Sequence, residues 1–301
     1  MKLYIKINDI QAFKNLESLL KGRYTLLKKL LEKDYPVEYR ANIQSLENLQ
    51  NNKHLFFTQR DIRKEIKGIY FGNDSCEHLI PSLEEIKEVF EFTKEKKLNF
   101  TLVLPPVSEF TIPKLKQIFQ FLNTKNSEVV VNDLGALNLG LKYKNIKLIA
   151  GLTFSKMIKP AFLELSNQNQ KELITHTEVE IDYYRQFFKS LGISRFSFEN
   201  IDIDYSFLNE KPYVNVDLYY PFIKISYSKA CNIAGLFNNI QNYFPVEHCP
   251  VYCKDVALDI KDVYFGIFQR YNSFYKLNEN LDLPKEVYSK KQNRLIWEIF
   301  L

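Results

Sequence analysis

The sequence predicts an α/β protein whose parallel strands form a TIM-like (β/α) barrel, either complete or incomplete and distorted. From about residue 66, short β-branched or aromatic runs alternate with helical patterns, and at least six such units follow one another. Parallel strands joined by right-handed helical crossovers produce this alternation. The chain has 301 residues, of which 46% are apolar, so it is long enough to bury one large core.

The first units of the series are punctuated by clear stop signals. Ser82 is a candidate N-cap for the first helix, and Pro105-Pro106 ends the second strand. The predicted elements are a strand over Gly68–Gly72, a helix over Pro81–Lys96, a strand over Phe100–Leu104 and a helix over Ile112–Leu122.

The alternation continues to residue 199. Gly192 is the residue type that ends helices in a left-handed conformation, and it closes the helix predicted over Tyr183–Leu191. The predicted elements are strands over Glu128–Asn132, Lys147–Gly151, Thr177–Ile181 and Arg195–Glu199, and helices over Leu134–Lys142, Ile158–Leu173 and Tyr183–Leu191.

The two ends of the chain are less regular. Val214–Ile225 predicts one long strand, and Lys285–Ile299 predicts a terminal helix. Residues 1–65 are either an N-terminal α/β extension or the first barrel units, and residues 66–301 form the barrel. The predicted elements of this first part are strands over Lys2–Asn8 and Val37–Arg40 and helices over Asp9–Glu32 and Ile43–Leu49.

Composition excludes few classes of protein. The net charge of +5 permits contact with RNA without arguing for it, since scattered lysines are usually a solvated surface. The first eight residues are too polar for a signal peptide, and no stretch reaches the roughly 20 apolar residues of a membrane span. We therefore expect a cytoplasmic protein, in which cysteines bind metals, act in catalysis or are simply buried.

Cysteine placement carries most of the chemical information. The chain has four cysteines, Cys76, Cys231, Cys249 and Cys253, and the last two form a C-x-x-x-C motif. Cys76 follows a predicted strand, on the kind of loop that builds barrel active sites, so all four can meet above one barrel mouth. Four thiolates are the ligand set of an iron–sulfur cluster or of a tetrahedral zinc site. The alternative is that they are independent small core residues.

A resemblance to a known family rests on four segments in register. They are Ile69–Cys76 (IYFGNDSC), Val130–Gly135 (VVNDLG), Ile225–Cys231 (ISYSKAC) and Cys249–Cys253 (CPVYC). Over residues 66 to 270 the chain resembles the collagenase-like peptidase family U-thirty-two, and within it the iron–sulfur branch linked to ubiquinone biosynthesis.

The resemblance implies a TIM-like barrel with a [4Fe-4S] cluster held by Cys76, Cys231, Cys249 and Cys253. It also implies a role in oxygen-independent hydroxylation of a small aromatic molecule or a nucleic-acid base. The expected partner is a second subunit in a heterodimer, and the chain is either the catalytic or an accessory subunit.

Polar residues near strand ends are candidates for a catalytic lining. Asn132 and Asp133 follow a predicted strand, where they either face the barrel mouth or, for Asp133, cap the next helix. Glu178 and Glu180 alternate in a predicted strand and would then face one side, as a general acid or base pair or as solvent-facing groups.

Two histidines lie near cysteines in the sequence. His78 and His248 are either ligands of the metal, residues that contact the ligands, or loop residues without a special role.

Two other functions stay open at this point. A structural zinc site would make the protein non-redox. A peptidase would need a catalytic centre, yet the sequence contains neither H-E-x-x-H nor G-x-S-x-G.

Overall fold

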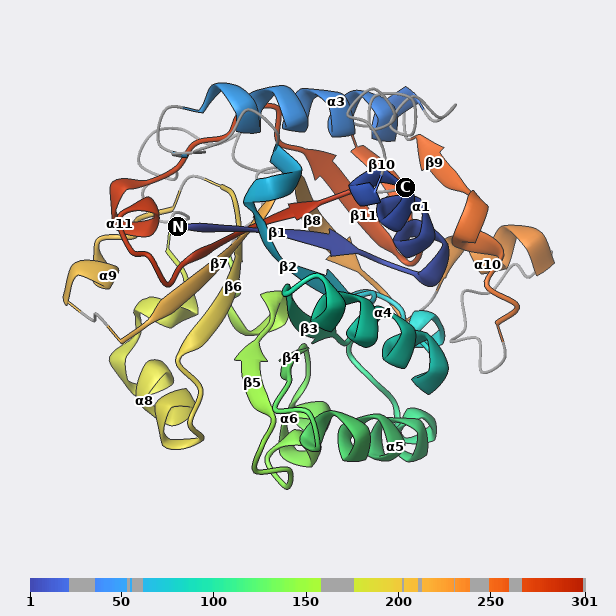
Figure 1. Cartoon of the computed structure of the whole chain (residues 1–301), viewed down its shortest axis with the longest axis horizontal. Helices are drawn as coiled ribbons and strands as arrows, with labels where there is room; N and C mark the ends of the chain where they lie inside the picture. Colours follow the sequence, from blue (N-terminus) through green and yellow to red (C-terminus); the bar gives the residue numbers. More distant parts are fainter. Residues whose placement is uncertain are drawn as a thin grey trace.

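Eight parallel strands close into a barrel in the order β1-β12-β7-β6-β5-β4-β3-β2 (Figure 1). The computed structural model describes residues 1–21, 36–52, 55, 62–157, 176–201, 203–210, 213–229, 231–238, 249–259 and 267–299. The predicted TIM-like barrel is thereby confirmed. Its strands are β1 (Lys2–Ile7), β2 (Ile66–Phe71), β3 (Asn99–Val103), β4 (Glu128–Val131), β5 (Lys147–Ala150), β6 (Arg195–Glu199), β7 (Asn215–Tyr220) and β12 (Arg294–Glu298).

Helices cover the outside of the barrel. Ser82 caps α4 with a complete capping box, because its hydroxyl accepts the Glu85 N–H while the Glu85 carboxylate accepts the Ser82 N–H. The α-helices are α1 (Ile10–Lys21), α3 (Pro36–Asn51), α4 (Leu83–Glu95), α5 (Ile112–Asn123), α6 (Leu134–Gly140), α8 (Asp182–Ser190), α9 (Phe207–Glu210), α10 (Asn232–Asn238) and α11 (Lys285–Tyr288). Short 3-10 helices include η2 (Glu77–Leu79), η3 (Glu109–Thr111), η6 (Glu178–Glu180) and η7 (Tyr252–Asp255).

A second, antiparallel sheet lies beyond the carboxyl end of β1 in Figure 1, next to α10. Its order is β8-β11-β10-β9, with strands β8 (Phe222–Tyr227), β9 (Ala257–Asp259), β10 (Ile267–Arg270) and β11 (Ser273–Leu277). The predicted strand over Val214–Ile225 is therefore two strands. Pro221 has no N–H to continue the ladder of β7, and the chain leaves the barrel there to enter the second sheet as β8.

Alternating side chains along the strands build two cores. Side chains such as Ile5 and Phe71 point outward and pack with helix residues such as Phe13 and Ile86. The inner face forms a separate cluster, which consists of Tyr4, Tyr70, Val103, Val130, Ile149, Tyr219 and Ile296. The barrel is therefore filled by side chains and is not a pore.

The first strand of the chain, β1, belongs to the barrel. β1 lies between β12 and β2 with parallel pairing on both sides, which agrees with the alternative of first barrel units, and a separate N-terminal extension is not confirmed. The strand predicted over Val37–Arg40 is wrong, since these residues belong to the helix α3. One β-branched residue, Val37, is only a weak signal for a strand.

The terminal helix predicted over Lys285–Ile299 is also wrong. Only the short helix α11 forms there, and Arg294–Glu298 is the strand β12. β12 pairs with β1 on one side and β7 on the other, and closes the barrel. A strand buried on both faces shows no alternation, so its local sequence does not distinguish it from a buried helix.

The strand predicted over Thr177–Ile181 is replaced by the 3-10 helix η6. The Thr177 hydroxyl accepts the Val179 N–H at 3.4 Å, and the Glu180 carboxylate accepts the Thr177 N–H at 2.9 Å. This capping box satisfies the backbone locally, so no strand partner is needed. The helix predicted over 158–173 lies outside the described residues.

Where the chain is described, no helix combines the length and apolar composition that crossing a bilayer requires.

If β12 closes the barrel, shortening a core side chain there must destabilise the whole protein. Leu295 is fully buried, and we expect Leu295→Ala to lower the free energy of unfolding by about 2–5 kcal/mol. The single tryptophan, Trp297, reports unfolding in urea by its fluorescence. Leu134→Ala, at a side chain that is 63% exposed, is the control and should change it by less than about 0.5 kcal/mol. A silent Leu295→Ala would contradict the strand's place in the core.

Candidate metal centre

Cys76 sits on a rigid loop at the carboxyl end of β2. Gly72 has a φ of 118°, and a Cβ there would lie 2.4 Å from the Val103 carbonyl oxygen, so only glycine fits. The Asn73 side chain then accepts the Ser75 N–H at 2.8 Å and the Cys76 N–H at 2.9 Å, as in an Asx turn. This loop is at the barrel face where TIM-barrel active sites are built.

Cys231 lies between β8 and α10. Its sulfur accepts the Ala234 N–H at 3.5 Å, and its thiol donates to the Tyr271 carbonyl oxygen at 3.9 Å. Two parts of the second sheet therefore position Cys231: strand β8, which precedes it in the chain, and the β10–β11 turn, which carries Tyr271.

The C-x-x-x-C motif turns sharply at Val251. This residue has a φ of 63°, which is rare for a β-branched side chain and costs on the order of 1–3 kcal/mol. The turn directs the Val251 N–H to the Cys249 sulfur at 3.3 Å and starts η7, which contains the buried Cys253. The surrounding structure therefore holds the motif in one unfavourable conformation.

The four thiols, all free, come from three separate parts of the chain, and those of Cys76, Cys231 and Cys253 share one small core. Buried Cys253 belongs to a small core with residues of the second sheet, and Cys76 and Cys231 pack against it. Cys249 interacts electrostatically with each of the other three. The members of this core are Ala41, Leu79, Phe222, Ile233, Cys253, Phe268, Tyr271 and Tyr275.

Backbone amides point at the sulfurs. The Ala234 N–H hydrogen-bonds to the Cys231 sulfur, and the nearby N–H groups of His78 and Leu79 act to lower the pKa of the Cys76 thiol. Such bonds favour the thiolate, but burial outweighs them. Burial raises the pKa of the thiols of Cys76 and Cys253 to about 12, with repulsion between neighbouring thiolates adding to it. Without a metal ion, these thiols are neutral at physiological pH.

The donor set fits thiolate ligation in its chemistry. As the side chains stand, no group of three or more His, Cys, Asp or Glu residues in the described ranges is arranged to hold a metal ion. Binding would therefore require the thiols to turn toward a common centre, which cysteine allows by rotation about its single χ1 angle. It would also require loss of the thiol protons, which a metal ion brings about.

A buried charge network lies directly under the Cys76 loop. Lys6 of β1 contacts Glu298 of β12 at 2.5 Å and Asp74 at 3.2 Å. Lys224 of β8 contacts the Asp74 carboxylate at 2.6 Å and the Asp74 carbonyl oxygen at 3.1 Å. Asp74 is thus bound by lysines of both sheets, two residues before Cys76.

The pKa directions show which charges this network holds. Burial alone would raise the pKa of Asp74, but the charges of Lys224 and Lys6 lower it well below its ordinary value. Burial would lower the pKa of Lys6, yet Asp74 and Glu298 raise it on balance. For Lys224, burial and the charge of Lys6 outweigh the attraction of Asp74, so its pKa is lowered. The sequence motifs considered above do not predict this network, although Lys6, inside the apolar run of β1, is a signal for a buried charge.

Asn132 and Asp133 have structural partners. The Asn132 amide donates to the Leu104 carbonyl oxygen at 2.7 Å, and Asn132 accepts from Thr153, so it ties together the ends of β3, β4 and β5. Asp133 caps α6 by accepting the Ala136 N–H at 2.9 Å, as the capping alternative predicts. Burial raises the pKa of Tyr227, at the end of β8, and the charge of Asp133 raises it further, so the two residues lie near each other at the barrel mouth.

The expectation that Glu178 and Glu180 face the same side rested on a strand, and these residues form the 3-10 helix η6 instead. The Glu180 carboxylate closes the capping box and lies 2.6 Å from the ring of His176. Their catalytic role stays a prediction without that support. His78 contributes its backbone to Cys76, and His248 lies outside the described residues.

No protein-family model, no curated protein and no solved structure matches this chain. The functional argument therefore rests on the geometry of the site and on the sequence motifs.

Removing the charge of Asp74 tests the network. Asp74→Asn leaves two buried ammonium groups poorly paired, and we expect a loss of about 3–5 kcal/mol in the free energy of unfolding. The pKa of Asp74 is lowered in the folded state, so its contribution is present at neutral pH and is lost as the pH falls through and below 3.8. Urea unfolding should show the difference between wild type and variant shrinking in acid. Asp282→Asn, at an exposed carboxylate, is the control and should cost little at any pH.

Thiol reactivity tests the electrostatics of the metal-free protein. A pKa of about 12 instead of 9.0 lowers the thiolate fraction of Cys76 and Cys253 at pH 8 by about a thousandfold. Brief iodoacetamide labelling followed by peptide mass spectrometry should leave both unmodified in folded protein and label both in urea. Rapid labelling of either in the folded protein would contradict the assignment.

Proposed function

We propose that this protein is an iron–sulfur protein in which Cys76, Cys231, Cys249 and Cys253 hold a [4Fe-4S] cluster at the carboxyl mouth of the barrel. One observation carries the proposal. Thiols from three separate parts of the chain lie in one small core beside the barrel, and backbone amides point at their sulfurs. Independent core cysteines have no reason to gather in this way, whereas cluster ligands must.

The chain's own residues would prepare the site. Amides on Cys76, Cys231 and Cys249 would stabilise thiolate charge, and the Lys6–Asp74–Lys224 network would hold the Cys76 loop in place. When bound, the cluster supplies electron transfer at a potential that depends on such hydrogen bonds and on burial.

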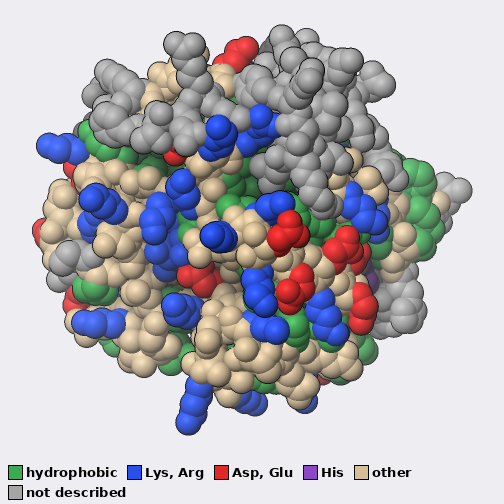
Figure 2. Space-filling model, in the orientation of Figure 1, with side chains coloured by type: hydrophobic (Ala, Val, Ile, Leu, Met, Phe, Trp, Pro, Cys, Tyr) green, Lys and Arg blue, Asp and Glu red, His purple; other side chains and the backbone are tan. Residues whose placement is uncertain are grey.

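The resemblance to the collagenase-like peptidase family U-thirty-two leads us to propose oxygen-independent hydroxylation of a small aromatic molecule or a nucleic-acid base. Exposed apolar side chains near the site support an aromatic ligand or a partner subunit there. On α10, Leu236 is 65% exposed and Phe237 is 55% exposed, and Figure 2 shows hydrophobic side chains protruding where α10 lies. Phe237 stacks on Tyr252, between the two cysteines of the C-x-x-x-C motif, with ring centroids 5.0 Å apart.

Anaerobic reconstitution tests the proposal. The protein should bind about four iron and four sulfide per chain and show a broad absorption band near ~400 nm that dithionite bleaches. Each single Cys→Ala variant should lose most of the band, because every thiolate holds one iron. Tyr227→Phe, at a half-exposed side chain near Asp133, should keep it.

Other results would point elsewhere. A colourless protein with about one zinc would favour the structural-metal alternative. A metal-free protein that cleaves peptides would favour the peptidase alternative. Loss of the band in Tyr227→Phe as well would mean that the assay reports folding and not ligation.

A further inference from the structure

A cavity of about 430 Å³ opens at the amino-terminal face of the barrel, opposite the cysteines. Among the residues that line it, Glu128, Lys147, Arg195 and Asn215 are the first residues of the neighbouring strands β4, β5, β6 and β7. All these strands are parallel, so their first residues share one face, whereas Cys76 follows the carboxyl end of β2. The cavity is therefore independent of the candidate metal centre.

The cavity exists because β5 and β6 separate. They pair only at Ala150 and Phe196, near the carboxyl end of β5, while β4 and β5 pair along their whole length. Apart from that single pair, no backbone pairing between β5 and β6 is found in the described residues. The volume is within the range of sites that bind small molecules.

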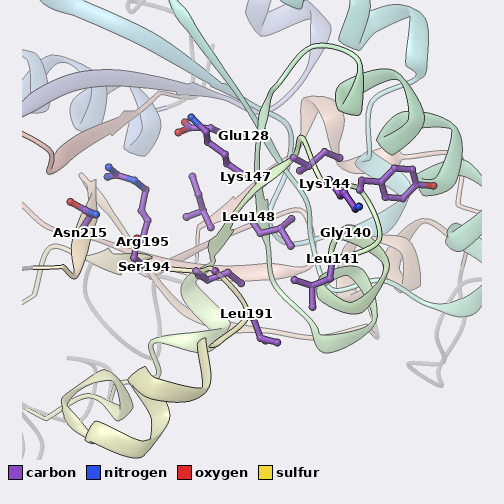
Figure 3. Close-up of a pocket in the computed structure, with 15 residues that line it drawn as sticks. Glu128, Gly140, Leu141, Lys144, Lys147, Leu148, Leu191, Ser194, Arg195 and Asn215 are labelled. Atoms are coloured by element: carbon purple, nitrogen blue, oxygen red, sulfur yellow. The ribbon is translucent and has the colours of Figure 1, made fainter. Parts of the chain in front are cut away.

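Its lining combines an apolar wall with cationic ends. Figure 3 shows Leu148, Leu141 and Leu191 along one side, and the side chains of Lys147 and Arg195 extending toward the other. A ligand in this space would meet both apolar surface and positive charge. The apolar residues of the lining are Leu141, Ile146, Leu148, Ile149, Leu191 and Ile193.

The two arginines near the cavity are already neutralised. Arg195 contacts Asp217 at 2.7 Å, and Arg294 binds both carboxylate oxygens of Glu128 at 2.7 and 2.9 Å. Lys144 and Lys147 form no ion pair or hydrogen bond through their side chains with any residue in the described ranges. The ammonium groups of Lys144 and Lys147 therefore leave an excess of positive charge at the cavity.

We propose that this cavity binds a small organic anion, in which one carboxylate is joined to an apolar body. The carboxylate would lie near Lys147, the apolar body would lie against Leu148 and its neighbours, and Lys144 would add positive charge on the other side of Leu148 (Figure 3). Such a ligand would bridge β5 and β6 where the backbone does not, and so would stabilise the native barrel.

Fluorine NMR with 4-fluorobenzoate tests this on the whole chain. The probe's signal should broaden on adding protein, and the protein's melting temperature should rise with probe concentration. The cation 4-fluorobenzylammonium has the same body and the opposite charge, and it should not bind. Inorganic phosphate, which has charge but no apolar body, should neither bind as tightly nor displace the probe.

Variants locate the binding. Lys144→Met with Lys147→Met should weaken 4-fluorobenzoate binding by about tenfold, since each partly exposed ion pair contributes modestly. Lys116→Met with Lys142→Met removes the same charge from exposed positions that do not line the cavity and should leave affinity unchanged. Leu148→Trp should fill the cavity and abolish binding while the circular dichroism spectrum stays that of wild type.

The proposal fails if no probe binds, if the cation binds equally well, or if phosphate competes at equal concentration. It also fails if both lysine pairs have the same effect, because binding would then follow net charge and not this cavity. None of these outcomes depends on iron, so they are distinguishable from a failure of the cluster proposal.

Discussion

Lys6 is a fully buried ammonium group, and the carboxyl end of the barrel is built around satisfying it. Its partners are Glu298, which is 292 residues away, and Asp74, which is 68 residues away. A buried cation without partners would cost several kcal/mol, so β1, β12 and the loop after β2 must come together correctly. Through Lys224, the same requirement extends to β8 and the second sheet.

This constraint links the barrel to the cysteines. Asp74 is fixed by two lysines, Ser75 contacts the Tyr275 hydroxyl at 2.9 Å, and the Asn272 amide donates to the Ser75 carbonyl oxygen at 2.9 Å. The residues just before Cys76 are therefore held by the barrel below and by the second sheet above. The backbone at Cys76 would therefore need little further ordering in the proposed metal centre, and only the rotation of its thiol about χ1 would remain.

The two faces of the barrel have different electrostatics. At the carboxyl face, buried lysines and carboxylates neutralise one another beneath neutral thiols. At the amino face, Arg294 and Arg195 are matched by Glu128 and Asp217, and Lys144 and Lys147 remain as surplus charge. One face is therefore suited to a metal centre that displaces protons, and the other to an anion. The apolar layer of Tyr4, Tyr70 and Ile296 separates them inside the barrel.

Local sequence signals were enough to predict the strands and helices from β2 to β5 and the pair α8 and β6, because caps and turns such as those at Ser82 and Gly192 act within a few residues. It also placed Cys76 on a loop at the carboxyl face of the barrel. The strand at Arg294–Glu298 and the place of β1 in the barrel could not be predicted in this way, since both depend on pairing between segments at the two ends of the chain. The Lys6 network and the β5–β6 cavity arise from contacts between distant segments; the lysine inside the apolar run of β1 indicates a buried charge, but its partners could not be predicted from local patterns.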